Sequence, residues 1–196
     1  MDNSTDRIIL IDKPLRWTSF DVVKKLKKPL LEEYRLQFPE AERKTIKRFK
    51  VGHAGTLDPL ASGILVVGIG RSATKTLGMH LAKDKEYLAT GCMGLVSSTG
   101  DAEGVKTKIS NKRLRHPTQE QLSTVLSRFI GEIDQIPPIY SAIKIHGKTA
   151  YNLARAGVPL TLGARRVRID MIELLGYRYP RFRMRIVCGP GMYVRS

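Results

Sequence analysis

The chain has 196 residues, of which 42% are hydrophobic, so it is long enough to form a domain with a core of its own. Its 34 lysines and arginines outnumber 18 aspartates and glutamates, which gives a formal net charge of +16. This excess indicates a polyanionic partner, and the lack of an apolar stretch of roughly 20 residues argues against a membrane-spanning helix. We therefore expect a soluble intracellular protein located in the cytoplasm, with the nucleus and the mitochondrion left open.

Helices and strands are expected in mixed order along the chain. Apolar periodicity and turn residues predict a strand at 8–12, a helix at 19–28, a loop at 51–63, a strand at 64–67, a helix at 72–81, a strand at 86–93, helices starting at 117 and spanning 150–156, and strands at 166–177 and 182–188. Pro29 and Pro39 bracket a charged stretch between the first helix and the loop. The order of elements is typical of an α/β chain dominated by a mixed sheet.

Basic residues are concentrated in three segments, at 24–50, 105–116 and 155–185. The first carries ten basic and four acidic side chains, and the second carries five basic side chains and no acidic one. Each segment alone can be an ordinary solvated face. Together they favour a phosphate-binding surface, whose affinity should fall steeply with salt because bound phosphates release counterions.

Cysteines and two short motifs bear on other functions. Cys92 and Cys188 lie in apolar strand-like segments without a partner at metal-ligand spacing, so we expect buried free thiols and neither a disulfide nor a zinc site. Residues 68–73, GIGRSA, satisfy a dinucleotide-binding fingerprint, but the repeated βαβ units are missing and an ordinary strand-to-helix turn is favoured. Residues 101–104 lack the spaced carboxylates of an EF-hand, and we interpret them as a turn.

The segment 51–63, VGHAGTLDPLASG, is the most informative part of the chain. Three glycines and a proline disfavour a regular helix or strand, which predicts a shaped loop. The apolar run that follows predicts a buried strand that would anchor the loop. From the residues alone, Asp58 is either a turn former before proline or a catalytic nucleophile.

Five segments in a fixed order carry a family resemblance. They are KP and WTS within 13–19, GHAGTLDPLASG at 52–63, KEY at 85–87, QIPPIYSAIK at 135–144 and GMYVRS at 191–196. Together they resemble the TruB family of pseudouridine synthases, and five ordered matches are far more specific than one. The resemblance implies the pseudouridine synthase catalytic fold, α+β with a central mixed, largely antiparallel sheet flanked by helices. It also implies a monomer that needs no cofactor and no metal.

The resemblance assigns three catalytic residues. Asp58 would be the nucleophile, Tyr87 would stack on the flipped base and could act as acid or base, and Arg195 would pair with Asp58. A guanidinium beside a carboxylate favours its charged form, which a nucleophile requires. The residues by themselves leave two alternatives open: Tyr87 as a core tyrosine, and Arg195 as part of a frayed terminus.

Five further residues are assigned to RNA binding by the same resemblance: His53, Lys13, Gly55, Tyr140 and Lys144. His53 would orient RNA, with a loop-capping imidazole as its structural alternative. The resemblance also implies one catalytic domain over 1–196, incomplete at its C-terminus and without the RNA-binding PUA domain, with a possible RNA-clamping insertion at 94–150. The last expected strand, at 191–196, carries the arginine.

The function implied is that of a stand-alone tRNA pseudouridine synthase. Its partner would be the T stem-loop of tRNA, where it would flip and isomerise the uridine at position 55. One alternative is a weakly active or inactive RNA-binding and tRNA-folding protein, because the family continues beyond the GMYVRS segment. Another is a guide-RNA-dependent relative of the Cbf5/dyskerin branch. The segment 93–104 and the basic stretch to 115, which that branch shortens, favour the stand-alone type.

Overall fold

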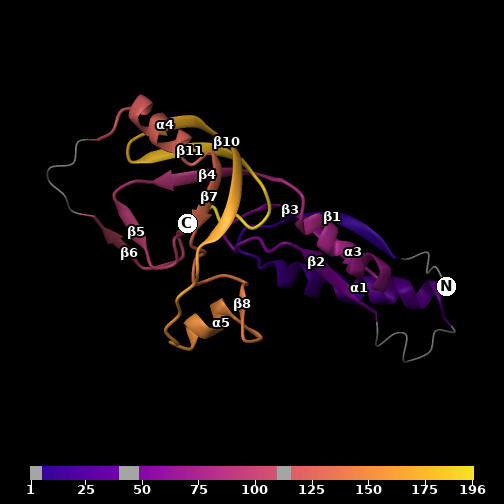
Figure 1. Ribbon diagram of the computed structural model, residues 1–196. Helices are drawn as coiled ribbons and strands as arrows, with labels where there is room; N and C mark the ends of the chain where they lie inside the picture. The colour runs from indigo at the N-terminus through magenta and orange to yellow at the C-terminus, as the bar shows by residue number, and fades with distance from the viewer. Residues whose placement is uncertain (1–5, 40–48, 110–115) are drawn as a thin grey trace. The chain divides into compact units, whose positions relative to one another are not determined.

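The computed structural model describes residues 6–39, 49–109 and 116–196 (Figure 1). The chain divides into two compact units, Met1–Ala82 and Lys83–Ser196. Each unit is built around its own antiparallel sheet. Within the described ranges, no helix is both long and apolar enough to cross a membrane.

The first unit is a three-stranded sheet with a helix on each face. Its elements in chain order are β1 (Arg7–Lys13), α1 (Ser19–Gln37), β2 (Val51–Ala54), β3 (Gly63–Ile69) and α3 (Arg71–Leu81). The strand order is β1-β3-β2, and both pairings are antiparallel. The GIGRSA motif is therefore a turn between β3 and α3, because a dinucleotide-binding unit requires parallel strands. The Asp6 carboxylate occupies this helix start, accepting from the Ser72 N–H at 2.6 Å.

One face of β3 forms the core beneath α1. Leu65, Val67 and Ile69 are at most 1% exposed, whereas Ile64 on the other face is 70% exposed. The strand is thus exposed near its start and buried toward its end, and not buried along its whole length as expected. Leu57 packs against this same core, which anchors the loop that carries its neighbour Asp58.

The opposite face of the sheet receives α3 at close range. Gly52 and Gly68 are directly paired between β2 and β3. A Cβ atom on Gly68 would lie 3.2 Å from a Leu77 methyl carbon, and one on Gly52 would lie 3.3 Å from the other methyl. Glycine at these two positions lets the helix approach the sheet this closely.

Helix α1 continues nine residues beyond the expected end at 28. Thr18 caps its start, with a reciprocal pair of hydrogen bonds to Asp21. Pro29 inside the helix removes a backbone hydrogen bond and costs about 3 kcal/mol. Tyr34 offsets that cost, because it is buried with Phe49 against the sheet and each such side chain contributes about 1.5–3 kcal/mol. Tertiary packing thus overrides the local proline signal.

The expected loop at 51–63 is shorter in the structure. Residues Val51–Ala54 form the edge strand β2, paired from Val51 with Ile69 to Ala54 with Val66. The irregular part therefore begins at Gly55, whose φ of 83° favours glycine. Backbone pairing with β3 outweighs the glycine at position 52.

The second unit is a four-stranded antiparallel sheet with two hairpins and two short helices. Its elements are β4 (Lys85–Cys92), β5 (Leu95–Ser97), β6 (Lys106–Lys108), α4 (Gln119–Ser127), β7 (Gly131–Gln135), β8 (Lys144–Ile145), β9 (Lys148–Thr149), α5 (Ala150–Arg155), β10 (Arg165–Arg178) and β11 (Arg181–Cys188). The sheet order is β4-β11-β10-β7, and the hairpins are β5-β6 and β8-β9. The α+β class is confirmed. Every strand pair within the described ranges is antiparallel, and the Asp101 segment is a turn between β5 and β6.

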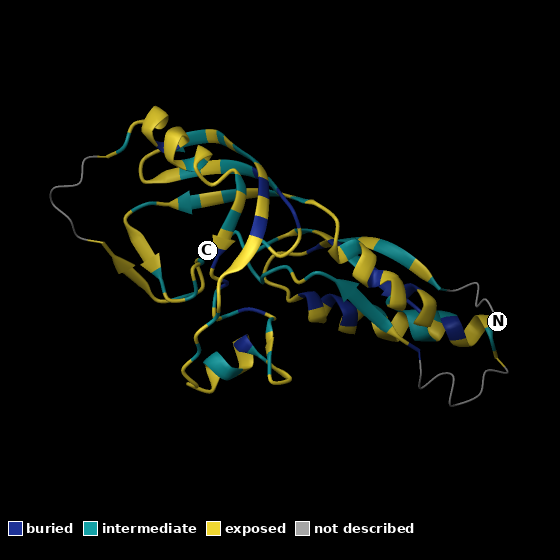
Figure 2. Cartoon of the chain, viewed as in Figure 1, coloured by how far each residue is buried: buried dark blue, intermediate teal, exposed yellow. Residues whose placement is uncertain are grey.

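The core of the second unit lies where β10 and β11 bury alternate residues (Figure 2). Ile169, Ile186 and Cys188 form its centre. Burial raises the pKa of the Cys188 thiol, as expected for a buried free cysteine. Cys92 is also free but exposed, so its expected burial is wrong. It follows from the alternation along β4, which turns every second residue outward.

Candidate active site

The Asp58 loop joins β2 to β3 in the first unit and is closed by a backbone hydrogen bond. The Ala61 N–H donates to the Asp58 carbonyl oxygen at 3.0 Å, which makes a tight turn after the aspartate. Beyond it, Gly63 opens β3 with a φ of 119° and pairs with Lys13 of β1. The carboxylate thus lies in a short turn held between two strands of one sheet.

The first residue of α1 and the segment before it hold both neighbours of Asp58. The Leu57 N–H donates to Ser19 Oγ at 3.0 Å, and this hydroxyl lies 3.3 Å from the Leu57 carbonyl oxygen. On the other side, the Arg16 N–H donates to the Pro59 carbonyl oxygen at 2.7 Å. Ser19 is only 1% exposed. The peptide groups on either side of the candidate nucleophile are therefore fixed by residues about forty positions earlier.

Lys13 holds the segment between β1 and α1 from within. Its side chain is fully buried, and Nζ donates to the Trp17 carbonyl oxygen at 2.6 Å and to the Pro14 carbonyl oxygen at 3.0 Å. Burial lowers the pKa of Lys13, against the opposing effect of the negative charges of Asp58 and Asp21. The ammonium is thus close enough to Asp58 to interact with it electrostatically. Its expected contact with RNA stays a prediction, because here it bonds to backbone carbonyls.

His53 and Gly55 form a local pair at the end of β2. His53 Nδ1 lies 2.6 Å from the Gly55 carbonyl oxygen. Because a carbonyl oxygen can only accept, Nδ1 carries the proton and Nε2 is the remaining polar ring atom. The loop-capping geometry is present, and the RNA-orienting role of both residues stays a prediction.

Tyr87 lies at an inward position of β4 in the second unit. It pairs with Ile186 across the sheet and packs against the core around Ile169 and Cys188. The ring is only partly buried. This placement suits a residue whose ring rests on the core while part of it stays accessible, and stacking on a base stays a prediction.

Arg195 is held at several points within the second unit. Nη1 donates to the Thr99 carbonyl oxygen at 3.1 Å, and Nη2 donates to the Tyr140 carbonyl oxygen at 3.0 Å. Nη1 also lies 3.5 Å from Asp101 Oδ2. A frayed terminus is therefore ruled out for this side chain. Asp58 belongs to the first unit, and its pairing with Arg195 stays a prediction.

Asp101 is itself oriented by its own turn. Its Oδ1 accepts from Thr99 Oγ1 at 2.5 Å and from the Glu103 N–H at 2.9 Å. The carboxylate is 15% exposed and the Arg195 side chain 12%. Weak solvent screening makes this ion pair stronger than a surface pair.

The last six residues are attached through Gln135 and do not form the expected strand. Gln135 Nε2 donates to the Tyr193 carbonyl oxygen at 2.9 Å, while the Tyr193 N–H donates to Gln135 Oε1 at 2.8 Å. The amide side chain thus replaces a strand partner. Met192 and Val194 pack against the same core as Tyr87, which places Arg195 in register with its partners.

Tyr140 and Lys144 lie around the small hairpin β8-β9. The Tyr140 ring meets the edge of Tyr151 with centroids 6.3 Å apart, and Arg155 lies 4.7 Å above the Tyr151 ring. Lys144 is exposed. Contacts of both residues with RNA stay predictions.

The expected site residues are thus distributed over both units. The first unit carries Asp58, Lys13, His53 and Gly55; the second carries Tyr87, Arg195, Tyr140 and Lys144. The sequence predicts Ser19 or Thr18 as the cap of the first helix, and Thr18 is the cap. The bonds that Ser19 and Gln135 make to Leu57 and Tyr193 were not predicted. The only signal in the sequence was a polar residue within each motif. The burial of that residue and its bonding partner depend on the tertiary structure. Among the described residues, no cluster of three or more His, Cys, Asp or Glu side chains could hold a metal.

Comparisons with known proteins agree on one family. Residues 43–194 match the family model described as "TruB family pseudouridylate synthase (N terminal domain)". The chain is 40% identical over 196 residues to tRNA pseudouridine synthase B of Phocaeicola vulgatus, covering 100% of this chain and 78% of that protein. It is 41% identical over the same length to the protein of that name from Parabacteroides distasonis, with the same coverage.

Among solved structures, the chain is similar to one in the crystal structure of a Cbf5-Nop10-Gar1 complex. The TM-score is 0.61 and the sequence identity 26%. The match covers 96% of this chain and 41% of the solved chain, so our chain spans less than half of that one.

Proposed function

The chain belongs to the TruB family of pseudouridylate synthases, and we propose that it converts uridine to pseudouridine at position 55 in the T loop of tRNA. The relatives at 40% and 41% identity, both named tRNA pseudouridine synthase B, support tRNA as the substrate. The net charge of +16 suits such a polyanion. We further propose that the protein acts as a monomer in the cytoplasm.

The reaction is an isomerisation and balances without a cofactor. The bond between uracil N1 and ribose C1′ breaks, and a bond between C5 and C1′ forms. A proton leaves C5, and N1 takes one up. Since nothing is oxidised or reduced, protein side chains can supply the required groups.

In this proposal Asp58 is the nucleophile that attacks the ribose or the base ring. Tyr87 stacks on the extruded uracil and serves as acid or base in the later proton transfer. Arg195 pairs with Asp58 and favours its ionised form. His53, Gly55, Lys13, Tyr140 and Lys144 contact or position the RNA.

The observation that carries the proposal is the anchoring of the Asp58 loop. Ser19 holds the backbone of Leu57, the residue before Asp58, and the Arg16 N–H holds the carbonyl of Pro59, the residue after it. A nucleophile gains most of its effect from being held in a reactive geometry before the substrate arrives. A turn that merely connected two strands would not need a fully buried serine bound to it from another element.

A guide-RNA-dependent activity is the second candidate, because the similar solved structure is a Cbf5 complex. The higher identity to tRNA pseudouridine synthase B favours the stand-alone activity. We also propose that 94–150 is an RNA-clamping insertion within one catalytic domain. The exposed Lys106 and Lys108 on the β5-β6 hairpin support this role.

The test uses an unmodified tRNA transcript whose uridines carry tritium at C5. Because C5 loses its hydrogen, pseudouridine formation releases tritium into water. We expect release by the 196-residue chain without a guide RNA, and none by its Asp58→Asn variant or from a transcript with cytidine at position 55. No release by the parent chain, with tRNA binding retained, would leave the RNA-binding alternative. Release only when a guide RNA is added would identify the guide-dependent type.

A further inference from the structure

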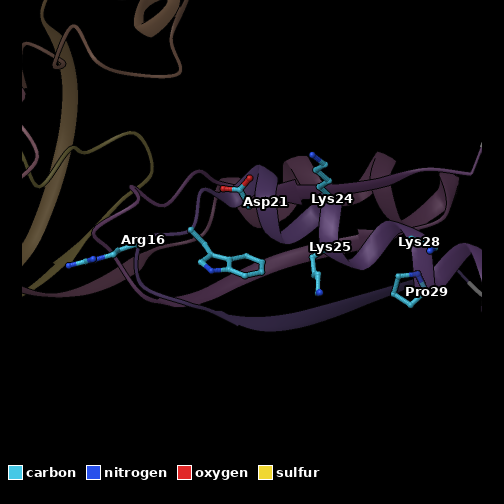
Figure 3. Close-up of a pocket in the computed structure, with 7 residues that line it drawn as sticks. Arg16, Asp21, Lys24, Lys25, Lys28 and Pro29 are labelled. Carbon is cyan, nitrogen blue, oxygen red and sulfur yellow. The ribbon is translucent and has the colours of Figure 1, made fainter.

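A basic hollow lies beside the first turns of α1 (Figure 3). Its volume is about 690 Å³. The residues that line it are Arg16, Trp17, Asp21, Lys24, Lys25, Lys28 and Pro29. Four cations, one carboxylate and an aromatic ring therefore face a single depression in the first unit.

The helical spacing explains why these lysines gather. Lys24, Lys25 and Lys28 lie three, four and seven residues after Asp21, so the four residues share one face of α1. A helix rises about 6 Å over four residues, which spreads the lysines along the hollow. The three lysines thus form an elongated row of positive charge.

The one carboxylate in the hollow is already engaged. Asp21 Oδ2 accepts from the Thr18 N–H at 2.9 Å and from Thr18 Oγ1 at 2.6 Å. None of the ion pairs found across the described ranges involves Lys24, Lys25 or Lys28. The three exposed lysines, beside an Asp21 carboxylate that is hydrogen-bonded to Thr18, leave a net positive surface that an external anion can neutralise.

The hollow adjoins the Asp58 loop through one backbone hydrogen bond. The backbone N–H of Arg16, which lines the hollow, donates to the carbonyl oxygen of Pro59, the residue after Asp58. A strand of RNA that presents a nucleotide to Asp58 therefore passes close to Arg16. Because the hollow is continuous with the Asp58 loop, we expect one RNA molecule to bind at both.

We propose that this hollow binds the strand of the substrate RNA that flanks the target uridine, with the lysines on its phosphates and Trp17 stacked on an unpaired base. The proposal rests on the function proposed above. Trp17 is 36% exposed, and an aromatic face among basic side chains is the arrangement that binds unpaired nucleotides without sequence preference. The hollow thus increases the affinity of the protein for the RNA and orients the flanking strand, and it takes no part in the chemistry.

The first experiment measures the salt dependence of tRNA binding. Asp58→Asn is the starting protein, so that the RNA is not converted. Lys24→Gln with Lys28→Gln should reduce the magnitude of the slope of log affinity against log salt by about 1.4 to 1.8, since each lost phosphate contact reduces it by roughly 0.7–0.9. Affinity should fall roughly tenfold or more at 0.1 M salt.

The matched control exchanges two exposed lysines outside the hollow and outside the proposed RNA-binding segments, Lys75→Gln with Lys83→Gln. This pair removes the same charge and should leave the slope nearly unchanged. Equal slopes for the two double variants would overturn the proposal, because general charge and not the hollow would then govern binding. Thermal unfolding of both variants shows whether either is misfolded.

The second experiment uses Trp17, the only tryptophan in the chain, as a reporter. Saturating tRNA should quench its fluorescence by stacking, after correction with free tryptophan amide. Unchanged emission at saturation would overturn the stacking contact. Emission that responds to anionic phospholipid vesicles but not to tRNA would identify a membrane surface and overturn the proposal. Tritium release is scored separately, so loss of the hollow's contribution and absence of synthase activity are distinguished.

Discussion

Arg195 and Asp101 form an ion pair, with 3.5 Å between Nη1 and Oδ2, in which neither side chain is more than 15% exposed. The same guanidinium donates to two backbone carbonyls, of Thr99 and Tyr140. The next-to-last residue of the chain is thereby held against two distant segments of the second unit. Asp101 therefore acts as a positioning residue for the arginine that we expect to serve the nucleophile.

We predict that Asp101→Asn impairs turnover more than binding. The variant removes the negative charge beside Arg195 and weakens the hydrogen bonds that the charged Asp101 accepts from Thr99 and Glu103. A hydrogen bond to a charged group contributes about 1.5–3 kcal/mol, which corresponds to roughly 10- to 100-fold in rate. Tritium release under single-turnover conditions should slow by that factor, with tRNA affinity nearly unchanged. Glu103→Gln, which removes a neighbouring exposed charge, is the control. Equal rates for both variants would show that the ion pair does not position Arg195.

Gln135→Leu should destabilise the second unit. The change keeps the side-chain volume but leaves the N–H and carbonyl of Tyr193 without their amide partner, at about 1–3 kcal/mol for each group. Denaturant unfolding should give a loss of about 2–6 kcal/mol. The exposed Gln119→Leu serves as control and should change stability little. A stability equal to that of the parent would mean that Tyr193 finds other partners.

Ser19→Ala should loosen the Asp58 loop. The variant removes the hydroxyl that bonds the Leu57 N–H, and an unpaired buried group costs about 1–3 kcal/mol. We expect kcat to fall at least tenfold while KM for tRNA changes little, since the loop would lose geometry and not charge. The control, Ser127→Ala, removes an exposed hydroxyl that donates to the Thr124 carbonyl oxygen. A raised KM with normal kcat would assign Ser19 to substrate binding instead.

Acid should weaken the start of α1 through Asp21. Hydrogen bonds from the Thr18 hydroxyl and backbone N–H hold the pKa of the Asp21 carboxyl below its usual 3.8. For a carboxylate whose folded pKa is depressed, the stabilisation is present above 3.8 and is lost as pH falls through the lower folded value. Unfolding free energies measured between pH 5 and pH 2 should therefore decline less steeply for Asp21→Asn than for the parent chain.

Thr18→Ala provides the matching check, because it removes the hydroxyl donor while leaving Asp21 in place. Its acid dependence should resemble that of Asp21→Asn. A parental slope in Thr18→Ala would contradict the assignment of the acid dependence to this cap.

Local patterns in the chain were enough to predict most elements and the candidate nucleophile. Apolar periodicity and turn residues predicted strands where β1, β4, β10 and β11 lie and helices where α3, α4 and α5 lie. Five ordered motifs indicated the family before any geometry was known, and 43–194 matches its model. Such features can be predicted from the sequence because they depend on residues near one another along the chain.

Tertiary structure decided what local patterns could not. The core contact of Tyr34 carries α1 beyond Pro29, pairing with β3 makes Val51–Ala54 a strand, and alternation on β4 exposes Cys92. The bonds that hold the site join residues 38 positions apart at Ser19 and 58 positions apart at Gln135. A side chain's burial and partner are set by packing between distant segments, and no pattern within either segment specifies them.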